Sequence, residues 1–189
     1  LSIAPIDRVI TAGDSVEYHA TATDMYGNNW GVTDAAVFIA NGAGSFVGST
    51  FTGTITGTYT INAVYEGQTA ATTVIINHAA PTKLSILPIN AVLTAGSSID
   101  YHATAADTWG NTWDVSDVAT FTSSGGDMNG KRFCGTIADT YVIQAVYEGN
   151  IGTTAVIITP AAPIALIIHP EDMTITAGNI VEYHVTATD

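Results

Sequence analysis

Residues 15–24 read Ser-Val-Glu-Tyr-His-Ala-Thr-Ala-Thr-Asp, and this stretch determines the fold that we expect. Side chains at Val16, Tyr18, Ala20 and Ala22 alternate with polar side chains at the positions between them. An alternation with a period of two is typical of a β-strand that buries one of its faces. We therefore predict a strand here, called the organising strand below, with these four side chains directed into a core.

The same stretch occurs twice more, at residues 98–107 and 180–189. The copies are 83 and then 82 residues apart, and each one follows a Thr-Ala-Gly turn signal. A constant spacing of this length indicates tandem modules, each large enough to bury its own core. We predict complete modules at 1–81 and 84–163, and the first two strands of a third module at 166–189.

Short alternating runs separated by Gly- and Asp-containing turn signals make up the rest of each repeat. Without any helical period, this pattern predicts an all-β fold of tandem immunoglobulin-like, seven-stranded antiparallel sandwiches. The linkers at 78–83 and 160–165 are short and contain proline, so they should act as semi-rigid joints. Trp30 and Trp113 occupy equivalent strand positions, and we expect them at the centre of the core.

The third copy ends at Asp189 after two strands, and two strands alone are not stable. Its missing strands would come either from further residues of the chain or from a neighbouring subunit. We favour continuation of the chain, because the first module has no spare strand to lend.

The charge balance limits the classes of partner. The formal net charge is −13 and the chain has only four Lys and Arg residues, so phosphate backbones and anionic membranes would repel it. We expect no nucleic-acid partner and, since the sequence has no transmembrane run, no direct membrane insertion of this segment. Charged residues make up 11% of the chain, against about 25% for an ordinary domain, which indicates a surface that meets other protein.

Five stretches together resemble the bacterial and archaeal immunoglobulin-like repeats of long cell-surface and S-layer-type proteins. They are Thr11-Ala-Gly13, the series from Tyr18 to Asn28, Asn111-Thr-Trp-Asp-Val-Ser116, Gly57-Thr-Tyr-Thr-Ile61 and residues 71–77. The resemblance covers the whole chain and implies an extracellular or cell-surface location. It also implies that the modules act mainly as spacers and assembly units. The resemblance is specific for the fold and says little about function, because function depends on particular sites.

A histidine recurs on the outward face of each organising strand, two residues after a carboxylate. The pairs are Glu17 with His19, Asp100 with His102, and Glu182 with His184. A pair of this kind forms a polar or inter-subunit face, gives a pH-sensitive contact, or shares a metal ion, although two ligands are too few for a structural zinc.

The turn after each complete strand contains Asp and Asn four residues apart, as Asp24 with Asn28 and Asp107 with Asn111. These oxygen atoms suit Ca²⁺, the only cofactor that the sequence indicates. Turn formation is the competing explanation, because Asp bonds its own following backbone and Gly accepts a positive φ.

Catalysis has little support in the sequence. There is no Gly-x-Ser-x-Gly, phosphate-binding loop or His-Glu-x-x-His motif, and the carboxylates recur in every repeat. Cys134 matches Thr52 of the first repeat, which indicates a small strand residue rather than a nucleophile. We expect no enzyme activity.

Apolar residues also occupy the outward positions of the last two strands in each repeat. They either form a lateral contact that is buried in an assembly or reflect only the strand propensity of branched residues. The predicted assembly interface consists of Val64, Ile75, Val142, Val146, Ala155 and Ile157.

These features together predict a structural extracellular protein that associates with itself into a surface layer, sheath or filament. The first alternative is an adhesin stalk, which holds a binding domain away from the cell. The second is a glycan-binding module, for which Met25 with Tyr26 and Thr108 with Trp109 at the hairpin tips are the candidate contacts.

Overall fold

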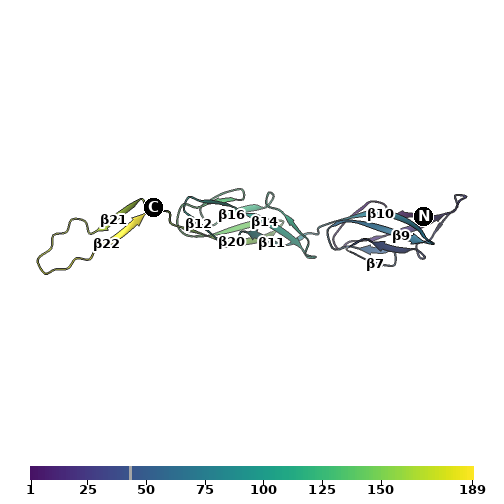
Figure 1. Cartoon of the computed structure of the whole chain (residues 1–189), viewed down its shortest axis with the longest axis horizontal. Coiled ribbons are helices and arrows are strands. Elements are labelled where there is room, and N and C mark those ends of the chain that lie inside the picture. Colours follow the sequence, from purple (N-terminus) through teal and green to yellow (C-terminus); the bar gives the residue numbers. More distant parts are fainter. Residues whose placement is uncertain (43) are drawn as a thin grey trace. The chain divides into compact units, whose positions relative to one another are not determined.

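The computed structural model describes residues 1–42 and 44–189, and every regular element in these ranges is a β-strand (Figure 1). No helix in the described ranges is long and apolar enough to cross a membrane. The chain divides into two compact units, one formed by Leu1–Leu84 with Thr104–Asp114 and the other by Ser85–Ala103 with Val115–Asp189. Residues 1–83 are called the first repeat below, and residues 84–165 the second.

The strands of the first repeat form three small sheets. One contains β1 (Ser2–Ala4), β4 (His19–Thr23) and β5 (Asn29–Gly31) in that order. A four-stranded sheet has the order β2 (Arg8–Thr11), β10 (Gln68–Asn77), β9 (Gly57–Tyr65), β6 (Val37–Ala40). The third contains β3 (Ser15–Glu17), β8 (Thr50–Thr52) and β7 (Ser45–Val47).

The second repeat has the same three sheets in the same order. They are β11 (Pro81–Leu87), β14 (His102–Asp107) and β15 (Thr112–Asp114); β12 (Ala91–Thr94), β20 (Asn150–Thr159), β19 (Thr140–Tyr147) and β16 (Thr120–Ser123); and β13 (Ser98–Asp100), β18 (Arg132–Cys134) and β17 (Asp127–Asn129). The predicted all-β fold of tandem immunoglobulin-like sandwiches is confirmed.

One strand pair in each repeat departs from the antiparallel prediction. β2 runs parallel to β10, and β12 runs parallel to β20. The reason lies at the start of the repeat, where the chain leaves β1 in one sheet and continues in the same direction as β2 in another. The early strand of the repeat therefore lies beside the last one.

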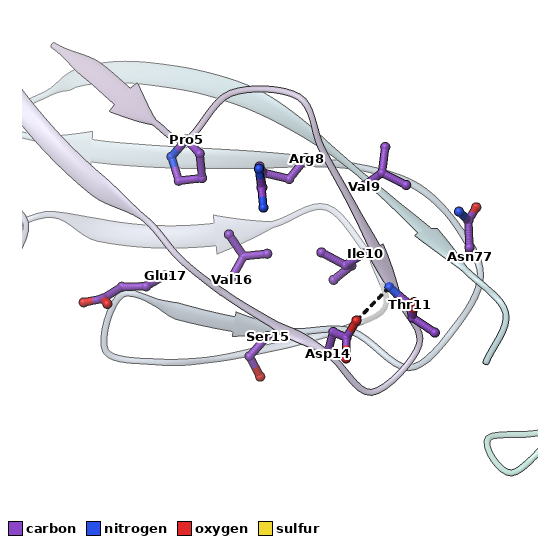
Figure 2. Close-up of a pocket in the computed structure, with 10 residues that line it drawn as sticks. All are labelled: Pro5, Arg8, Val9, Ile10, Thr11, Asp14, Ser15, Val16, Glu17 and Asn77. Atoms are coloured by element: carbon purple, nitrogen blue, oxygen red, sulfur yellow. Dashed lines mark hydrogen bonds between the residues drawn. The ribbon is translucent and has the colours of Figure 1, made fainter. Parts of the chain in front are cut away.

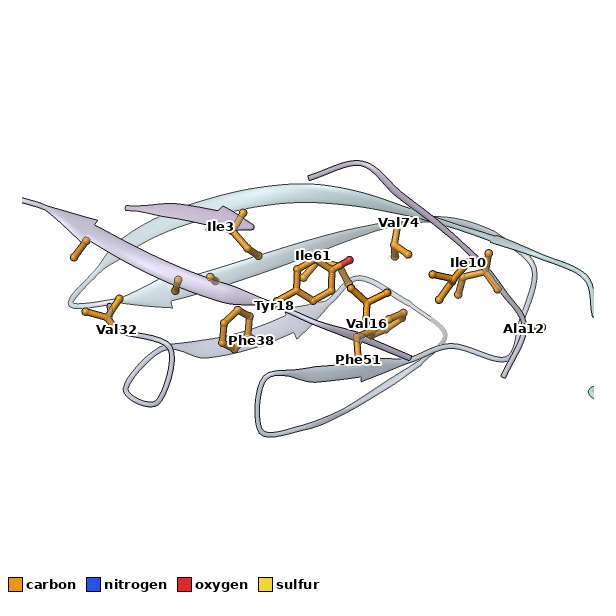
Figure 3. Packing of buried hydrophobic residues seen from close by; sticks show 14 residues of the cluster. Ile3, Ile10, Ala12, Val16, Tyr18, Val32, Phe38, Phe51, Ile61 and Val74 are labelled. Atoms are coloured by element: carbon orange, nitrogen blue, oxygen red, sulfur yellow. The ribbon is translucent and has the colours of Figure 1, made fainter. Parts of the chain in front are cut away.

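The predicted inward face of the organising strand is confirmed in both complete repeats. Val16, Tyr18, Ala20 and Ala22 are at most 7% exposed, and Figure 3 shows Tyr18 beside Ile61, Val16 and Phe51. In the second repeat the corresponding Tyr101, Ala103 and Ala105 are fully buried. Each large side chain buried in this way contributes about 1.5–3 kcal/mol.

The sequence predicted one continuous organising strand. In the structure this strand divides into two at its tyrosine. β3 pairs with β8, whereas β4 pairs with β1 and β5. At the division the Tyr18 N–H donates to the Ser49 carbonyl over 2.9 Å, and the Tyr101 N–H donates to the Lys131 carbonyl over 2.8 Å. Side-chain alternation continues through the division, so the burial pattern does not reveal it.

The expectation that Trp30 fills the core centre is wrong. Trp30 is 45% exposed, because it lies opposite Ala22, the last buried residue of β4, at the end of the sandwich. There it lines a shallow pocket together with Leu1 and Tyr65. Trp113 has the equivalent position and is half-buried. The core centre is formed instead by Tyr18 and Phe51, and by Tyr101 and Phe133 in the second repeat.

The third copy forms a two-stranded sheet of β21 (Ala165–His169) and β22 (His184–Thr188). Its pairing runs from Ala165 opposite Thr188 to His169 opposite His184. The side chains that are buried in the complete repeats are exposed here, with Tyr183 at 54% and Val185 at 63%.

Candidate interaction surfaces

The outward face of the four-stranded sheet bears apolar pairs at equivalent places in both repeats. In the first repeat Val9 of β2 lies opposite Ile75 of β10, and they are 57% and 41% exposed. In the second repeat Val92 of β12 lies opposite Ile157 of β20, at 62% and 41%. Each pair places two branched apolar side chains side by side on the sheet face. We call these two pairs the outer strip.

More apolar side chains extend this outward face towards β6 and β16. In the first repeat Val37 lies opposite Val64. In the second repeat Val142 lies opposite Ala155 and Val146 opposite Ile151. All of these side chains are exposed or half-exposed.

All six residues of the predicted assembly interface are exposed or half-exposed, and their role as an interface stays a prediction. Further apolar residues of the same face were not predicted from the sequence, namely Val9, Val37, Ile39, Val92 and Ile151. Val9 and Val92 lie in strands of only four residues, which are too short to show an alternation clearly. The parallel pairing of these strands with β10 and β20 places them on the face, and sequence spacing gives no signal for that pairing.

The predicted polar face consists of exposed residues on two different strands. Glu17 is on β3 and His19 on β4, with the strand division between them. In the second repeat the Asp100 carboxylate lies 3.9 Å from the Arg132 guanidinium, and Arg132 also donates to the Ser98 hydroxyl. His102, Glu182 and His184 are exposed. A pH-sensitive contact on this face stays a prediction.

The first turn is organised by Asp24. One of its carboxylate oxygens accepts the N–H groups of Tyr26 and Asn28, both at 2.9 Å, and the other accepts the Asn28 side-chain amide at 2.8 Å. Gly27 has a φ of +87°, which closes the turn. The Asn28 amide and these backbone N–H groups hold the pKa of Asp24 below its usual range.

The second turn repeats this geometry around Asp107. Its carboxylate accepts the N–H groups of Trp109 and Asn111 at 2.9 Å and the Asn111 side-chain amide at 2.7 Å. It also accepts the Ala79 N–H at 3.0 Å. Burial by itself would raise the pKa of Asp107, but the hydrogen bonds from Asn111, Ala79 and Trp109 together hold the pKa below its ordinary value.

Asn111 makes additional hydrogen bonds to the loop before β9. Its side-chain amide donates to the Thr54 carbonyl over 2.8 Å, and its carbonyl oxygen accepts the Thr56 N–H over 2.9 Å. Asp107 and Asn111 are only 4% and 8% exposed. All these residues belong to the first compact unit, because Thr104–Asp114 is part of it.

The turns thus show the hydrogen bonding that the sequence predicted for them. Calcium at Asp24, Asn28, Asp107 and Asn111 stays a prediction. No group of three or more His, Cys, Asp or Glu side chains that could hold a metal ion occurs in residues 1–42 and 44–189. The Asp oxygens already accept N–H donors, so a cation would have to displace these bonds or bind beside them.

Some solved structures are similar to this chain at low sequence identity. Domains 1–6 of the surface layer protein SbsC are 15% identical, with a TM-score of 0.35, over 90% of this chain and 31% of that chain. The N-terminal four Ig domains of Dscam1 isoform 1.9 are 9% identical, with a TM-score of 0.41, over 82% of this chain and 43% of that chain. This chain therefore spans about a third of the SbsC structure that it matches. No protein-family profile and no curated protein sequence matches it.

Aromatic residues lie close to the second turn in the same compact unit. The His78 ring stacks on the Trp113 indole, with centroids 3.7 Å apart and an interplanar angle of 7°. The Trp109 ring lies so close to Gly13 that a Cβ atom there would come within 2.9 Å of it. Of the predicted glycan contacts, Met25 and Tyr26 are more than 80% exposed, whereas Trp109 is 50% exposed.

A groove of about 540 Å³ lies between β2 and β3, where the chain passes from one sheet to the next (Figure 2). Arg8, Asp14 and Glu17 are its charged lining residues, and the Asp14 carboxylate accepts the Thr11 N–H over 3.1 Å. Arg8 corresponds to Ala91 in the second repeat, so the positive charge of this groove is not a feature of every module. Its residue types offer no nucleophile with a paired base.

Proposed function

We propose that this chain is a non-enzymatic structural protein of the cell surface, whose modules associate laterally and end to end into a layer, sheath or filament. The observation that carries the proposal is the outer strip, in which Val9 with Ile75 and Val92 with Ile157 form exposed apolar pairs at equivalent positions. Strand propensity explains a branched residue on a strand, but it does not require two such residues to be adjacent on neighbouring strands in each repeat.

Three further properties support association between copies. Charged residues make up 11% of the chain, so few charges oppose the burial of a sheet face. The resemblance to immunoglobulin-like repeats of cell-surface and S-layer-type proteins implies the same kind of role and location. An exposed strip repeated along a chain also allows many weak contacts to add up.

The test compares the wild-type chain with the double variant Ile75→Thr/Ile157→Thr by sedimentation velocity over a range of concentrations. Threonine keeps the branched shape and the strand propensity but loses about 1 kcal/mol of apolar burial at each site. We expect the association constant to fall about 10- to 30-fold.

Val47→Thr is the matched control, because Val47 is 83% exposed on β7, away from the four-stranded sheet. This variant should associate like the wild type. A wild-type chain that stays monomeric at millimolar concentration would contradict lateral assembly, and so would an equal effect of the control.

A further inference from the structure

The two turns have the same internal hydrogen bonds but different surroundings. Tyr26 and Trp109 donate to the preceding Asp at 2.9 Å, as do Asn28 and Asn111 through their backbone N–H groups. The side-chain amide bond within the turn is 2.8 Å in the first and 2.7 Å in the second. The first turn therefore already has the geometry of the second.

The second turn is occupied by the chain itself. The Asn111 side chain donates a hydrogen bond to the Thr54 carbonyl and accepts one from the Thr56 N–H. These two backbone groups lie on either side of Ile55. Asp107 accepts the N–H of Ala79. These are contacts to backbone groups of a Gly-Thr-Ile loop and of the small-residue segment that follows β10.

The third copy of the Asp repeats part of this arrangement. Asp189 accepts the N–H of Ala161 over 2.6 Å, and Ala161 is the residue that corresponds to Ala79. The Gly-Thr-Ile loop also recurs, as Gly135-Thr136-Ile137. The Asp therefore binds the corresponding linker amide at two places in the chain.

No residue that the structure describes occupies the first turn in this way. Asn28 is exposed, whereas Asn111 is 8% exposed. Among the residues that the structure describes, only the Asn28 side chain donates a hydrogen bond to Oδ2 of Asp24. Asp24 and Asn28 thus present the same donors and acceptors as Asp107 and Asn111, which bind backbone groups of the chain. This similarity points to a ligand with the same arrangement of backbone N–H and carbonyl groups.

We propose that the Asp24–Asn28 turn is a docking site for the end of another copy of this repeat. The occupant is a Gly-Thr-Ile loop, whose backbone carbonyl and N–H would bond Asn28, together with the linker N–H, which would bond Asp24. This proposal rests on the proposed end-to-end assembly and names its contact site. It is independent of the outer strip.

The test uses an extended chain in which residues 1–83 are placed directly before Leu1. The join keeps the natural spacing, because Leu84-Ser85-Ile86 repeats Leu1-Ser2-Ile3. Hydrogen exchange of the Asn28 side-chain amide is measured by NMR at a dilution where sedimentation shows a monomer. We expect exchange at least tenfold slower than in the unextended chain, with matching protection of the Thr56 N–H in the added copy.

In the extended chain, Asn28→Ala in the original copy should remove the protection of the Thr56 N–H in the added copy. The rest of the spectrum should stay unchanged. Asn28 exchange that is equal in the extended and unextended chains would overturn the proposal, as would a protected Thr56 N–H in the Asn28→Ala variant. Because the readout is taken on monomers, failure here would leave lateral assembly through the outer strip unaffected. Conversely, the Ile75→Thr/Ile157→Thr variant should retain the protection at Asn28.

Discussion

The imidazole of His78 lies flat on the indole of Trp113, with ring centroids 3.7 Å apart. Both residues belong to the first compact unit, and Trp113 is half-buried there. The equivalent Trp30 is 45% exposed. The stack therefore distinguishes two tryptophans that have the same place in the repeat.

Replacing His78 should reveal the contribution of this stack. His78→Ala removes the ring that covers one face of Trp113, and we expect a loss of about 1 kcal/mol in the free energy of unfolding. His78→Phe keeps a flat ring and should lose less. Urea denaturation followed by tryptophan fluorescence measures both variants. His19→Ala is the control, since His19 is exposed on β4 and should change the stability by less than about 0.5 kcal/mol.

Asn111 and Asn28 form a matched pair for testing the value of the loop contacts. Asn28→Ala removes only the bond to Asp24, whereas Asn111→Ala also leaves the Thr54 carbonyl and the Thr56 N–H without their partner. Each unsatisfied part-buried group costs about 1–3 kcal/mol. We expect Asn111→Ala to be the more destabilising by at least about 1 kcal/mol in urea denaturation. Equal effects would show that the loop contacts add nothing.

The stability of the first compact unit should fall in acid, and Asp107 should account for part of the fall. Its pKa in the folded chain lies below the unfolded value of about 3.9, so the folded chain binds fewer protons in that range. The contribution of the ionised Asp107 is complete well above pH 4 and is lost as the pH falls through the folded-state pKa.

Asp107→Asn should therefore be less stable than the wild type at pH 7, and the difference should shrink as the pH is lowered below about 4. Thermal denaturation at several pH values measures it. A difference that grows in acid would contradict the assignment.

The hydroxyl groups of Tyr18 and Tyr101 are buried, and neither has a hydrogen-bond partner among the described residues. Burial raises the pKa of both groups. Since an unpaired buried hydroxyl is unfavourable, Tyr18→Phe and Tyr101→Phe should be neutral or stabilising by up to about 1–2 kcal/mol.

Tyr18→Leu is the contrasting change, because it leaves a cavity beside Phe51 and should destabilise the fold by about 1–3 kcal/mol. Calorimetric melting temperatures compare these variants. A loss of more than about 1 kcal/mol in Tyr18→Phe would indicate that its hydroxyl is bonded in solution.

The sequence predicted the fold class and the core face of the organising strand, because a period of two is a local property of the chain. The burial of Tyr18, Ala20 and Ala22 follows directly from it. The division of the strand at Tyr18 could not be predicted in the same way. It depends on hydrogen bonds to Ser49 that leave the side-chain alternation unchanged.

The contact residues were predicted less completely. Asp24 and Asp107 occupy equivalent positions in the two turns, and the hydrogen bonding of both turns was predicted correctly. What separates them is the bonding of Asn111 to Thr54, 57 residues earlier. Contacts at such separations depend on how folded elements meet, and a single sequence has no local signal for them.

The parallel pairing of β2 with β10 also affects how a module would bear tension. Four consecutive residue pairs, from Arg8 opposite Val74 to Thr11 opposite Asn77, join a strand near the start of the repeat to its last strand. A pull along the chain at both ends would load these bonds together in shear, since parallel strands must slide past each other before any one bond is free. Antiparallel neighbours pulled from one end would instead open bond by bond. The same pairing of β12 with β20 gives the second repeat an equal capacity to resist stretching.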